Sequence, residues 1–431
     1  METRIFVTTD PDLRGHQRAK ERWNTNVHLY YSDDFFKTQR QALDSGNSII
    51  MTDHYIFIAK AVSSNTVKIH VARAEGGFLD FKQARMPINY HITDHFTVLD
   101  TNEKSVFLFV SDNNVENPVG NLFVSDGLGY RFTHSLENII KGGHAVDFEA
   151  CESMEGTFIA NRYDVNHGWS NVKNEGQLRT ITEDDILLSQ HEKDEHTRMS
   201  NSGSSNKKQL ISSREAGYKD TLDQYFTKIK TYITHNKGST WELIRSPDKD
   251  MNGNSFTCYI EDDCSLHLQM YSHKTAQFAS PYSVESAIGI VVAVGNVGRN
   301  VDFSRSGKKS TFLSRDGGLN FNEISSIPLI YDLGDHGGLI VAAPNLQATT
   351  QIRYSWNEGK TWTKLKISDV PIFVANIIQE PKSTSQQFLV YGAYDNATEV
   401  ENEYGEYDTI HQYGENIMIT LDFEGLHEPK C

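Results

Sequence analysis

The chain has 431 residues, of which 38% are hydrophobic and 23% are charged, with 19 tyrosines and 22 phenylalanines. This apolar content suffices for a sizeable core and argues against a disordered chain, while 10 prolines and 30 glycines exclude a collagen-like or Pro-rich fibrous protein. The formal net charge of −16 repels phosphate backbones and anionic lipid, so it disfavours nucleic-acid and polybasic membrane binding and permits a basic partner.

The first part of the chain carries three incomplete copies of a turn motif, the Asp box, with the pattern Ser-x-Asp-x-Gly-x-x-aromatic. They lie at residues 32–39, around 76–81 and at 125–132. The first copy lacks the glycine, the second has lost the polar positions, and the third has Gly127 where the pattern has Asp. Such self-similarity indicates a repeat protein.

Residues 169–228 are expected to be a largely disordered insertion, because they are polar, Ser-rich and almost free of large apolar residues. The acidic and histidine cluster at 191–196 resembles a metal site, but we interpret it as part of a solvated loop. The insertion divides the repeat-containing chain into a first part, 1–168, and a second part, 229–431; both parts are predicted below to consist of propeller blades.

Three closer copies of the box follow the insertion. They comprise Thr234, Asn236, Gly238 and Trp241; Ser314, Asp316, Gly318 and Phe321; and Ser355, Asn357, Gly359 and Trp362. An Asp or Asn side chain accepts hydrogen bonds from backbone N–H groups two residues on, and a Ser or Thr hydroxyl does the same from the other side. The glycine supplies φ > 0, and the aromatic side chain covers the turn. These residues are therefore predicted to form turns and not to be catalytic.

Strand-like segments flank the boxes. Residues 288–295 and 339–344 are continuous apolar runs, typical of inner strands that are buried on both faces. The boxes at 314 and 355 are 41 residues apart, which fits one box in each four-stranded propeller blade. The six boxes therefore predict an all-β fold, an Asp-box (BNR) β-propeller with about six blades.

Cysteines and a glycosylation motif bear on the compartment. Cys258 and Cys264 have a spacing that suits a small hairpin-closing disulfide and hence an oxidising lumen, while the nearby His267 leaves zinc as an incomplete alternative. Asn396 begins the single Asn-x-Thr sequon, which accepts a glycan only in the secretory pathway. The first residues contain no apolar leader, and no stretch approaches the ~18–20 apolar residues of a membrane span.

Several segments together resemble the sortilin-type family of luminal sorting receptors, whose fungal members carry carboxypeptidase Y to the vacuole. Their order and spacing match the later blades of that family's ten-bladed propeller. The matching segments are GTFIANRYD (156–164), THNKGSTWELI (234–244), SFTCYIEDDCSLHLQMYS (255–272), IGIVVAVGNVG (288–298), TFLSRDGGLNF (311–321), YDLGDHGGLIVAA (331–343) and YSWNEGKTW (354–362).

The resemblance implies a disulfide between Cys258 and Cys264. It also implies a longer receptor, with about ten blades, two cysteine-rich modules, a membrane span and a cytosolic sorting tail. The chain would then be about six blades of a larger ring, either cut from a longer receptor or forming a shortened paralogue. Residence in the Golgi or endosome lumen is expected, although the missing signal peptide would leave the chain in the cytosol.

The function that this resemblance implies is binding of protein or peptide cargo, such as vacuolar hydrolase precursors, without a cofactor, a metal or enzymatic activity. Family members face the cargo carboxylate with a basic group. This sequence shows no clear counterpart, so the ligand-binding residues stay unidentified. His54, in the strand that follows Asp53, is the nearest substitute, and we interpret it as an ordinary strand-end histidine.

Two other functions are considered. A sialidase-like glycoside hydrolase also carries Asp boxes, but it needs an arginine cluster and a Tyr–Glu pair, and no such motif surrounds the arginines here. A non-functional remnant is the third hypothesis. Gly295–Gly298 could suggest nucleotide binding, but this segment is predicted to be a strand that ends in a turn. Asp335 and His336 could suggest catalysis, but they are predicted to form a tight turn between strands.

Overall fold

The computed structural model describes residues 4–9, 27–63, 66–74, 79–87, 90, 92, 96–101, 104–111, 119–142, 145–164, 229–270, 278, 280–304, 307–380, 382–401, 407–424 and 426. This part of the chain is built from antiparallel β-strands and short turns, as predicted for an all-β protein. None of its helices is long and apolar enough to span a membrane. The insertion predicted at 169–228, with the cluster at 191–196, lies outside the described residues.

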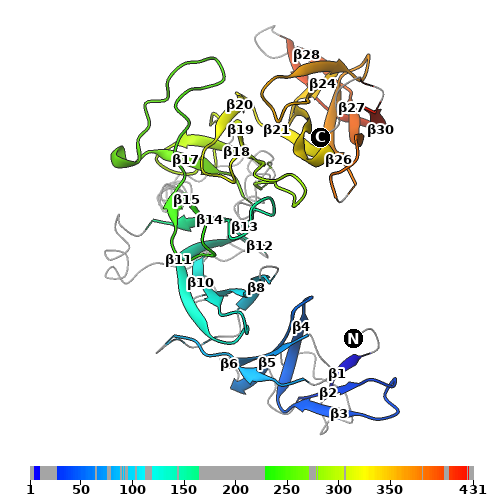
Figure 1. Ribbon diagram of the computed structural model, residues 1–431. Helices are drawn as coiled ribbons and strands as arrows, with labels where there is room; N and C mark the ends of the chain where they lie inside the picture. The colour runs from blue at the N-terminus through cyan, green and yellow to red at the C-terminus, as the bar shows by residue number, and fades with distance from the viewer. Residues whose placement is uncertain are drawn as a thin grey trace, which may run out of the picture. The chain divides into compact units, whose positions relative to one another are not determined.

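The chain forms two compact units, and the first comprises Met1–Lys141, Gly168–Thr197 and Lys237–Thr240. Its strands pair in the orders β1-β2-β3, β4-β5-β6-β7 and β8-β9-β10-β11 (Figure 1). The strands are β1 (Ile5–Thr9), β2 (His28–Ser32), β3 (Arg40–Leu43), β4 (Gly46–Met51), β5 (Tyr55–Ser63), β6 (Thr66–Arg73), β7 (Lys82–Gln83), β8 (Phe96–Asp100), β9 (Phe107–Ser111), β10 (Val119–Ser125) and β11 (Phe132–Gly142).

The second unit comprises Gly142–His167, Arg198–Asn236 and Trp241–Cys431. Its strands pair in the orders β13-β14-β15-β16, β17-β18-β19-β20, β21-β22-β24-β25 and β23-β26-β27-β30, and β28 pairs with β29. The elements are β12 (Ala145–Val146), β13 (Phe148–Ala150), β14 (Phe158–Tyr163), β15 (Ile229–Thr234), β16 (Glu242–Leu243), η3 (Ile260–Asp262), β17 (Ser265–Leu268), β18 (Val291–Gly298), β19 (Ser310–Ser314), β20 (Asn322–Ser325), β21 (Leu329–Gly334), η4 (Asp335–Gly337), β22 (Leu339–Pro344), β23 (Ala348–Thr349), β24 (Gln351–Ser355), β25 (Thr363–Lys366), β26 (Ile372–Ile378), β27 (Gln387–Asp395), β28 (Thr398–Glu401), β29 (Tyr407–Ile410) and β30 (Tyr413–Asp422).

Each run of four paired strands is here called a quartet, and within each unit a quartet packs face to face against the next one in the chain. Strand β18 shows how: Val291 and Ala293 face the quartet that starts at β13, whereas Val292 and Val294 face the quartet that starts at β21. Because side chains alternate along a strand, a continuous apolar run buries both faces at once. The prediction of doubly buried inner strands is confirmed for 291–295 in β18 and for 339–344 in β22. It is wrong for residues 288–290, which form a turn before β18, where Ile288 is 78% exposed.

The Asp boxes occupy one position in the quartets, the turn from the third strand to the fourth. The boxes at 125, 234, 314 and 355 join β10 to β11, β15 to β16, β19 to β20 and β24 to β25. The copy around Gly76 and Gly77 falls between β6 and β7, and those two glycines lie outside the described residues. Quartet β23-β26-β27-β30 has no box in its sequence. Its third and fourth strands, β27 and β30, are joined by a segment that contains the hairpin β28–β29. Counting boxes therefore does not count quartets, and the number of blades stays a prediction.

The box at Ser314 shows the hydrogen bonds that hold such a turn. The Ser314 hydroxyl donates to Asp316 Oδ1 at 2.8 Å and accepts the backbone N–H groups of Asp316 and Gly318 at 3.3 and 2.8 Å. Asp316 Oδ1 accepts the N–H of Asn320, four residues on, at 2.9 Å. The hydroxyl thus accepts N–H groups two and four residues on, whereas the carboxylate accepts one that lies four residues on and not the expected two. The box at Ser355 repeats this pattern at 2.8–3.3 Å.

The copies that look degraded in sequence still form closed turns. At Ser32, the hydroxyl accepts the N–H of Phe36 at 2.8 Å, and Asp34 accepts the N–H of Thr38 at 2.9 Å. Hydrogen bonds from Thr38 and Ser32 lower the pKa of the Asp34 carboxyl to about 2. In the copy with Gly127 at the Asp position, the preceding residue Asp126 accepts the N–H of Leu128 at 3.2 Å. Erosion of the sequence motif therefore leaves the hairpins intact.

Candidate functional site

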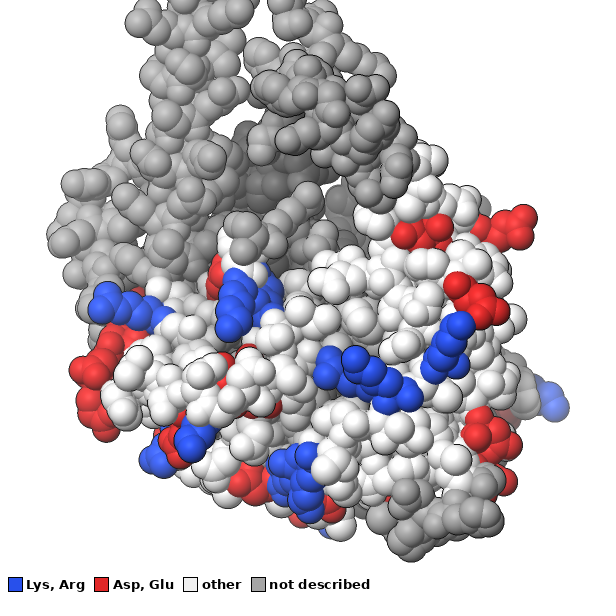
Figure 2. Space-filling view, turned by 90° about the horizontal axis from the view of Figure 1, so that it is seen from above, with Lys and Arg blue, Asp and Glu red and all other residues white. Residues whose placement is uncertain are grey.

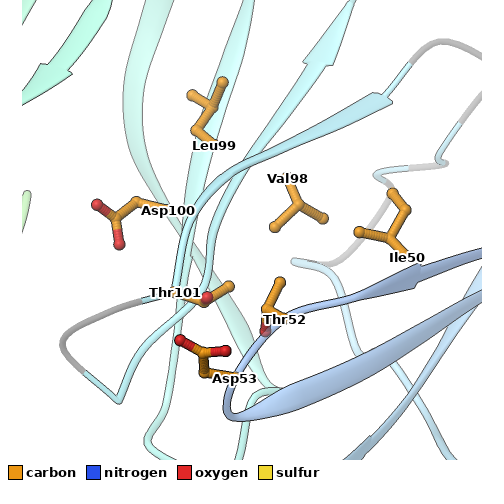
Figure 3. A pocket seen from close by; sticks show the side chains of 7 residues that line it. All are labelled: Ile50, Thr52, Asp53, Val98, Leu99, Asp100 and Thr101. Atoms are coloured by element: carbon orange, nitrogen blue, oxygen red, sulfur yellow. The ribbon is translucent and has the colours of Figure 1, made fainter.

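An open recess of about 300 Å³ lies in the first unit, beside the turn that joins β4 to β5 (Figure 3). Its lining comes from the end of β4 and the turn after it, and from β8 and the residue after it. The lining residues are Ile50, Thr52, Asp53, Val98, Leu99, Asp100 and Thr101. Figure 3 shows Ile50 and Val98 facing each other, with Thr52, Thr101 and Asp53 gathered at the other end.

Local hydrogen bonds fix the turn that carries Asp53. The Thr52 N–H donates to the Tyr55 carbonyl at 2.9 Å, and the Tyr55 N–H donates to the Thr52 hydroxyl at 3.1 Å. Tyr55 itself is 2% exposed and belongs to the core between the two quartets of this unit. The turn is therefore anchored at its base, while Asp53 is exposed at its tip.

The sequence analysis looked for a basic group that would face a cargo carboxylate, but the recess is acidic. Its walls offer apolar contact, two hydroxyl groups and carboxylates, with no basic side chain among the lining residues. His54 does not line it; the imidazole lies edge-on to the Tyr55 ring at a centroid distance of 6.4 Å. A carboxylate at an apolar recess favours a cationic group with an aliphatic stem, such as a Lys or Arg side chain or an amine. Sequence reasoning missed this recess because its halves lie more than 40 residues apart.

Three arginines of the described residues hydrogen-bond to turns or to strands beside them. The Arg73 guanidinium donates to the Gly127 carbonyl at 2.8 Å, and the Arg315 guanidinium donates to the Glu358 carbonyl at 2.7 Å. Arg353 donates to the Ser325 hydroxyl at 2.7 Å and lies over the Trp362 ring at 5.5 Å. These three side chains hold Asp-box turns or the strands beside them. Their guanidinium groups therefore have a structural role and are not gathered to bind a substrate carboxylate.

Two carboxyl groups in the second unit escaped the sequence analysis, one half-buried on Glu149 and one buried on Asp332. Burial raises the pKa of Glu149, on β13, to about 7 despite a hydrogen bond with Ser280 that lowers it; the nearby Glu152 also raises it. Burial likewise raises the pKa of Asp332, on β21, although its carboxylate accepts the Tyr282 hydroxyl at 2.8 Å. Neither residue sits in a recognisable motif, because only packing of the quartets takes them out of water.

The remaining predicted residues take the following places. Cys258 and Cys264 are joined by a disulfide. Asn396 is exposed in the turn between β27 and β28, where its backbone N–H donates to the Gln412 carbonyl at 2.9 Å.

The segment with Asp335 and His336 is the tight turn η4 between β21 and β22, with φ of +47° and +56°. Its Asp335 and His336 N–H groups donate to the Ser385 and Ser383 carbonyls, both at 3.0 Å.

Antiparallel quartets that follow one another in the chain, pack face to face and turn through Asp boxes define an Asp-box β-propeller protein. The family model of Sortilin-Vps10, described as "Sortilin, neurotensin receptor 3", matches residues 3–208 and 210–377. The chain belongs to the Sortilin-Vps10 family.

Curated relatives carry the name Vacuolar protein sorting/targeting protein 10. The protein of Trichophyton verrucosum is 27% identical over 434 residues, which cover 98% of this chain and 24% of the relative. That of Talaromyces stipitatus is 28% identical over 411 residues, or 94% of this chain and 23% of the relative. The chain thus spans about a quarter of the length of these relatives.

Solved structures show only a distant likeness. An ancestral GH74 enzyme superposes with a TM-score of 0.31 at 11% identity, covering 86% of this chain and 39% of that chain. A TM-score this low carries no argument about fold or function.

Proposed function

We propose that the chain is a cargo-binding part of a sorting receptor that carries soluble vacuolar hydrolase precursors from the Golgi to the endosome or vacuole, and that it is not an enzyme. Membership of the Sortilin-Vps10 family over most of the chain is the observation that supports this most strongly. The curated relatives are named for vacuolar protein sorting or targeting. Because the chain spans about a quarter of them, receptor activity, cargo and residence in the Golgi or endosome lumen are parts of the proposal.

Within this proposal, the recess beside Asp53 is a contact for cargo. The lining offers two aliphatic walls and a carboxylate, which suit a lysine or arginine side chain of an extended peptide. The net negative charge of the chain does not by itself make every surface favour a cationic side chain. On the face shown in Figure 2, acidic and basic side chains are interspersed.

The test is capture of soluble vacuolar hydrolase precursors by the folded, secreted chain. We expect binding that weakens several-fold in Asp53→Asn and is unchanged in Asp369→Asn, a matched substitution at an exposed aspartate paired with Lys366. Failure of a folded sample to capture any precursor would sink the receptor proposal for this chain. Capture that ignores Asp53 would reject only the recess. Hydrolysis of a fluorogenic sialoside would instead support the sialidase-like alternative.

A further inference from the structure

The loop closed by the Cys258–Cys264 disulfide, here called the stapled loop, presents apolar side chains to solvent. It lies between β16 and β17 and contains the short turn η3. Tyr259 is 60% exposed and Ile260 is 40% exposed, although both are large apolar residues. Exposed apolar residues are common when scattered singly, but two adjacent ones at the tip of a cross-linked loop form a small projecting patch.

The stapled loop is held rigid from within. The Asp262 and Cys264 N–H groups donate to the Tyr259 carbonyl at 3.0 and 3.1 Å, and the Asp263 N–H donates to the Ile260 carbonyl at 3.1 Å. Asp263 closes the turn in the left-handed conformation, with φ of +61°. The disulfide then joins the two ends of this hydrogen-bonded turn.

An ion pair fixes the base of the stapled loop to the β-sheet below it. The Asp263 carboxylate pairs with the ammonium group of Lys230 on β15, and that ammonium also lies 2.9 Å from Asp164, which follows β14. The Lys230 side chain is 5% exposed. The tip therefore cannot fold back to bury its apolar side chains, and its conformational entropy is already lost before any partner binds.

The two residues that follow Tyr259 and Ile260 in the loop are both acidic. Glu261 and Asp262 are exposed, and neither has an ion-pair partner within the described part of the chain, whereas Asp263 is used by Lys230. Two exposed carboxylates beside a tyrosine and an isoleucine repel anionic lipid and nucleic acid. A second copy of this chain, with a net charge of −16, is disfavoured for the same reason.

We propose that the stapled loop is a docking element for a partner protein whose surface offers an apolar pocket rimmed by lysine or arginine. Tyr259 and Ile260 fill the pocket, and Glu261 and Asp262 pair with the basic rim. A rigid tyrosine supplies large contact area at low entropic cost, which is why such residues dominate interface energetics. The proposal concerns the second unit alone and does not depend on the recess or on a sorting function.

The test uses a displayed library of random 12-residue peptides, selected on the folded chain. Counter-selection uses the variant Tyr259→Ser/Ile260→Ser. We expect enriched peptides that combine Lys or Arg with apolar residues. Their affinity should fall at least tenfold in that variant, and about threefold in Glu261→Gln/Asp262→Asn. The matched control is Leu346→Ser, which removes a 47% exposed apolar side chain from another turn and should change nothing.

A second measurement separates docking from folding. Cys258→Ser/Cys264→Ser keeps Tyr259 and Ile260 but releases the loop ends, so binding should weaken while the thermal midpoint of the remaining fold is retained. Enriched peptides that are acidic, or that bind the chain and the Tyr259→Ser/Ile260→Ser variant equally, overturn the proposal. Absence of any binder to a folded sample with an intact disulfide overturns it as well.

Discussion

At the scale of single residues, Phe36 shows that the Asp box depends on its serine and aspartate more than on its glycine. Phe36 stands where the other boxes have Gly318 and Gly359, yet its N–H makes the same 2.8 Å hydrogen bond to the serine hydroxyl. Its φ is +61°, a conformation that costs an L-residue about 1–2 kcal/mol. At Gly318 a Cβ would also lie 2.6 Å from Ile233 Cδ1. Glycine is therefore required where a neighbouring quartet packs on the turn.

Opposite effects are expected from exchanging the residue types at these two positions. Phe36→Gly should raise the free energy of unfolding by about 0.5–1 kcal/mol, because relief of strain exceeds the added entropy of a glycine. Gly318→Ala should lower it by about 2 kcal/mol or more through strain and contact with Ile233. Thermal unfolding of both variants beside the parent chain measures this. A destabilised Phe36→Gly would show that the half-buried ring contributes more than the strain costs.

At the scale of elements, the position of Glu149 on strand β13 makes the stability of the fold depend on pH. Glu149 on β13 is taken out of water by packing, so the pKa of its carboxyl rises to about 7 in the folded chain. Between the ordinary pKa of 4.5 and about 7, the folded chain binds a proton that the unfolded chain releases. The contribution of this residue to stability is therefore lost as pH rises through that window and is fully present below it.

Replacing Glu149 by glutamine should remove this dependence. We expect Glu149→Gln to be more stable than the parent at pH 8 by roughly 1–3 kcal/mol, and the difference to shrink toward zero near pH 4.5. Denaturant unfolding at a series of pH values checks it. The exposed acid Glu424 provides the control, since Glu424→Gln should leave the pH profile of the parent unchanged. A constant offset at all pH values would mean that Glu149 is not protonated in the folded state.

At the scale of the whole molecule, features distant in sequence indicate one compartment. The Cys258–Cys264 disulfide needs an oxidising environment, and the sequon at Asn396 lies exposed in a turn, accessible to a glycosyltransferase. The two features belong to different segments of the second unit and form independently. Both fit a protein that folds in the secretory pathway.

We expect a single N-glycan when the chain is expressed behind a secretion signal in yeast. Treatment with an endoglycosidase should increase electrophoretic mobility by one step, and Asn396→Gln should abolish that shift without lowering secretion. Asn376→Gln, at an asparagine outside any sequon, is the control. A secreted, folded chain that carries no glycan would contradict the accessibility of this turn.

The sequence by itself determined the features whose interactions are local. An Asp box is closed by hydrogen bonds within five residues, and a doubly buried strand is one apolar run, so the hairpins, the all-β class and the inner strands could be predicted. The disulfide has the same short range. Even eroded motifs such as the one at Ser32 keep the residues that make these bonds.

Only the tertiary structure decided what depends on packing between segments far apart in the chain. The recess forms where two quartets bring together Asp53 and Thr101, which lie far apart in the chain. No local sequence pattern marks either residue. Quartet β23-β26-β27-β30 carries no box, so only the pairing of its strands in the structure identifies it as a quartet. The high pKa of Glu149 likewise arises from burial, and the stapled loop is tied to Lys230 by an ion pair between distant segments; both are properties of the packed fold and not of neighbouring residues.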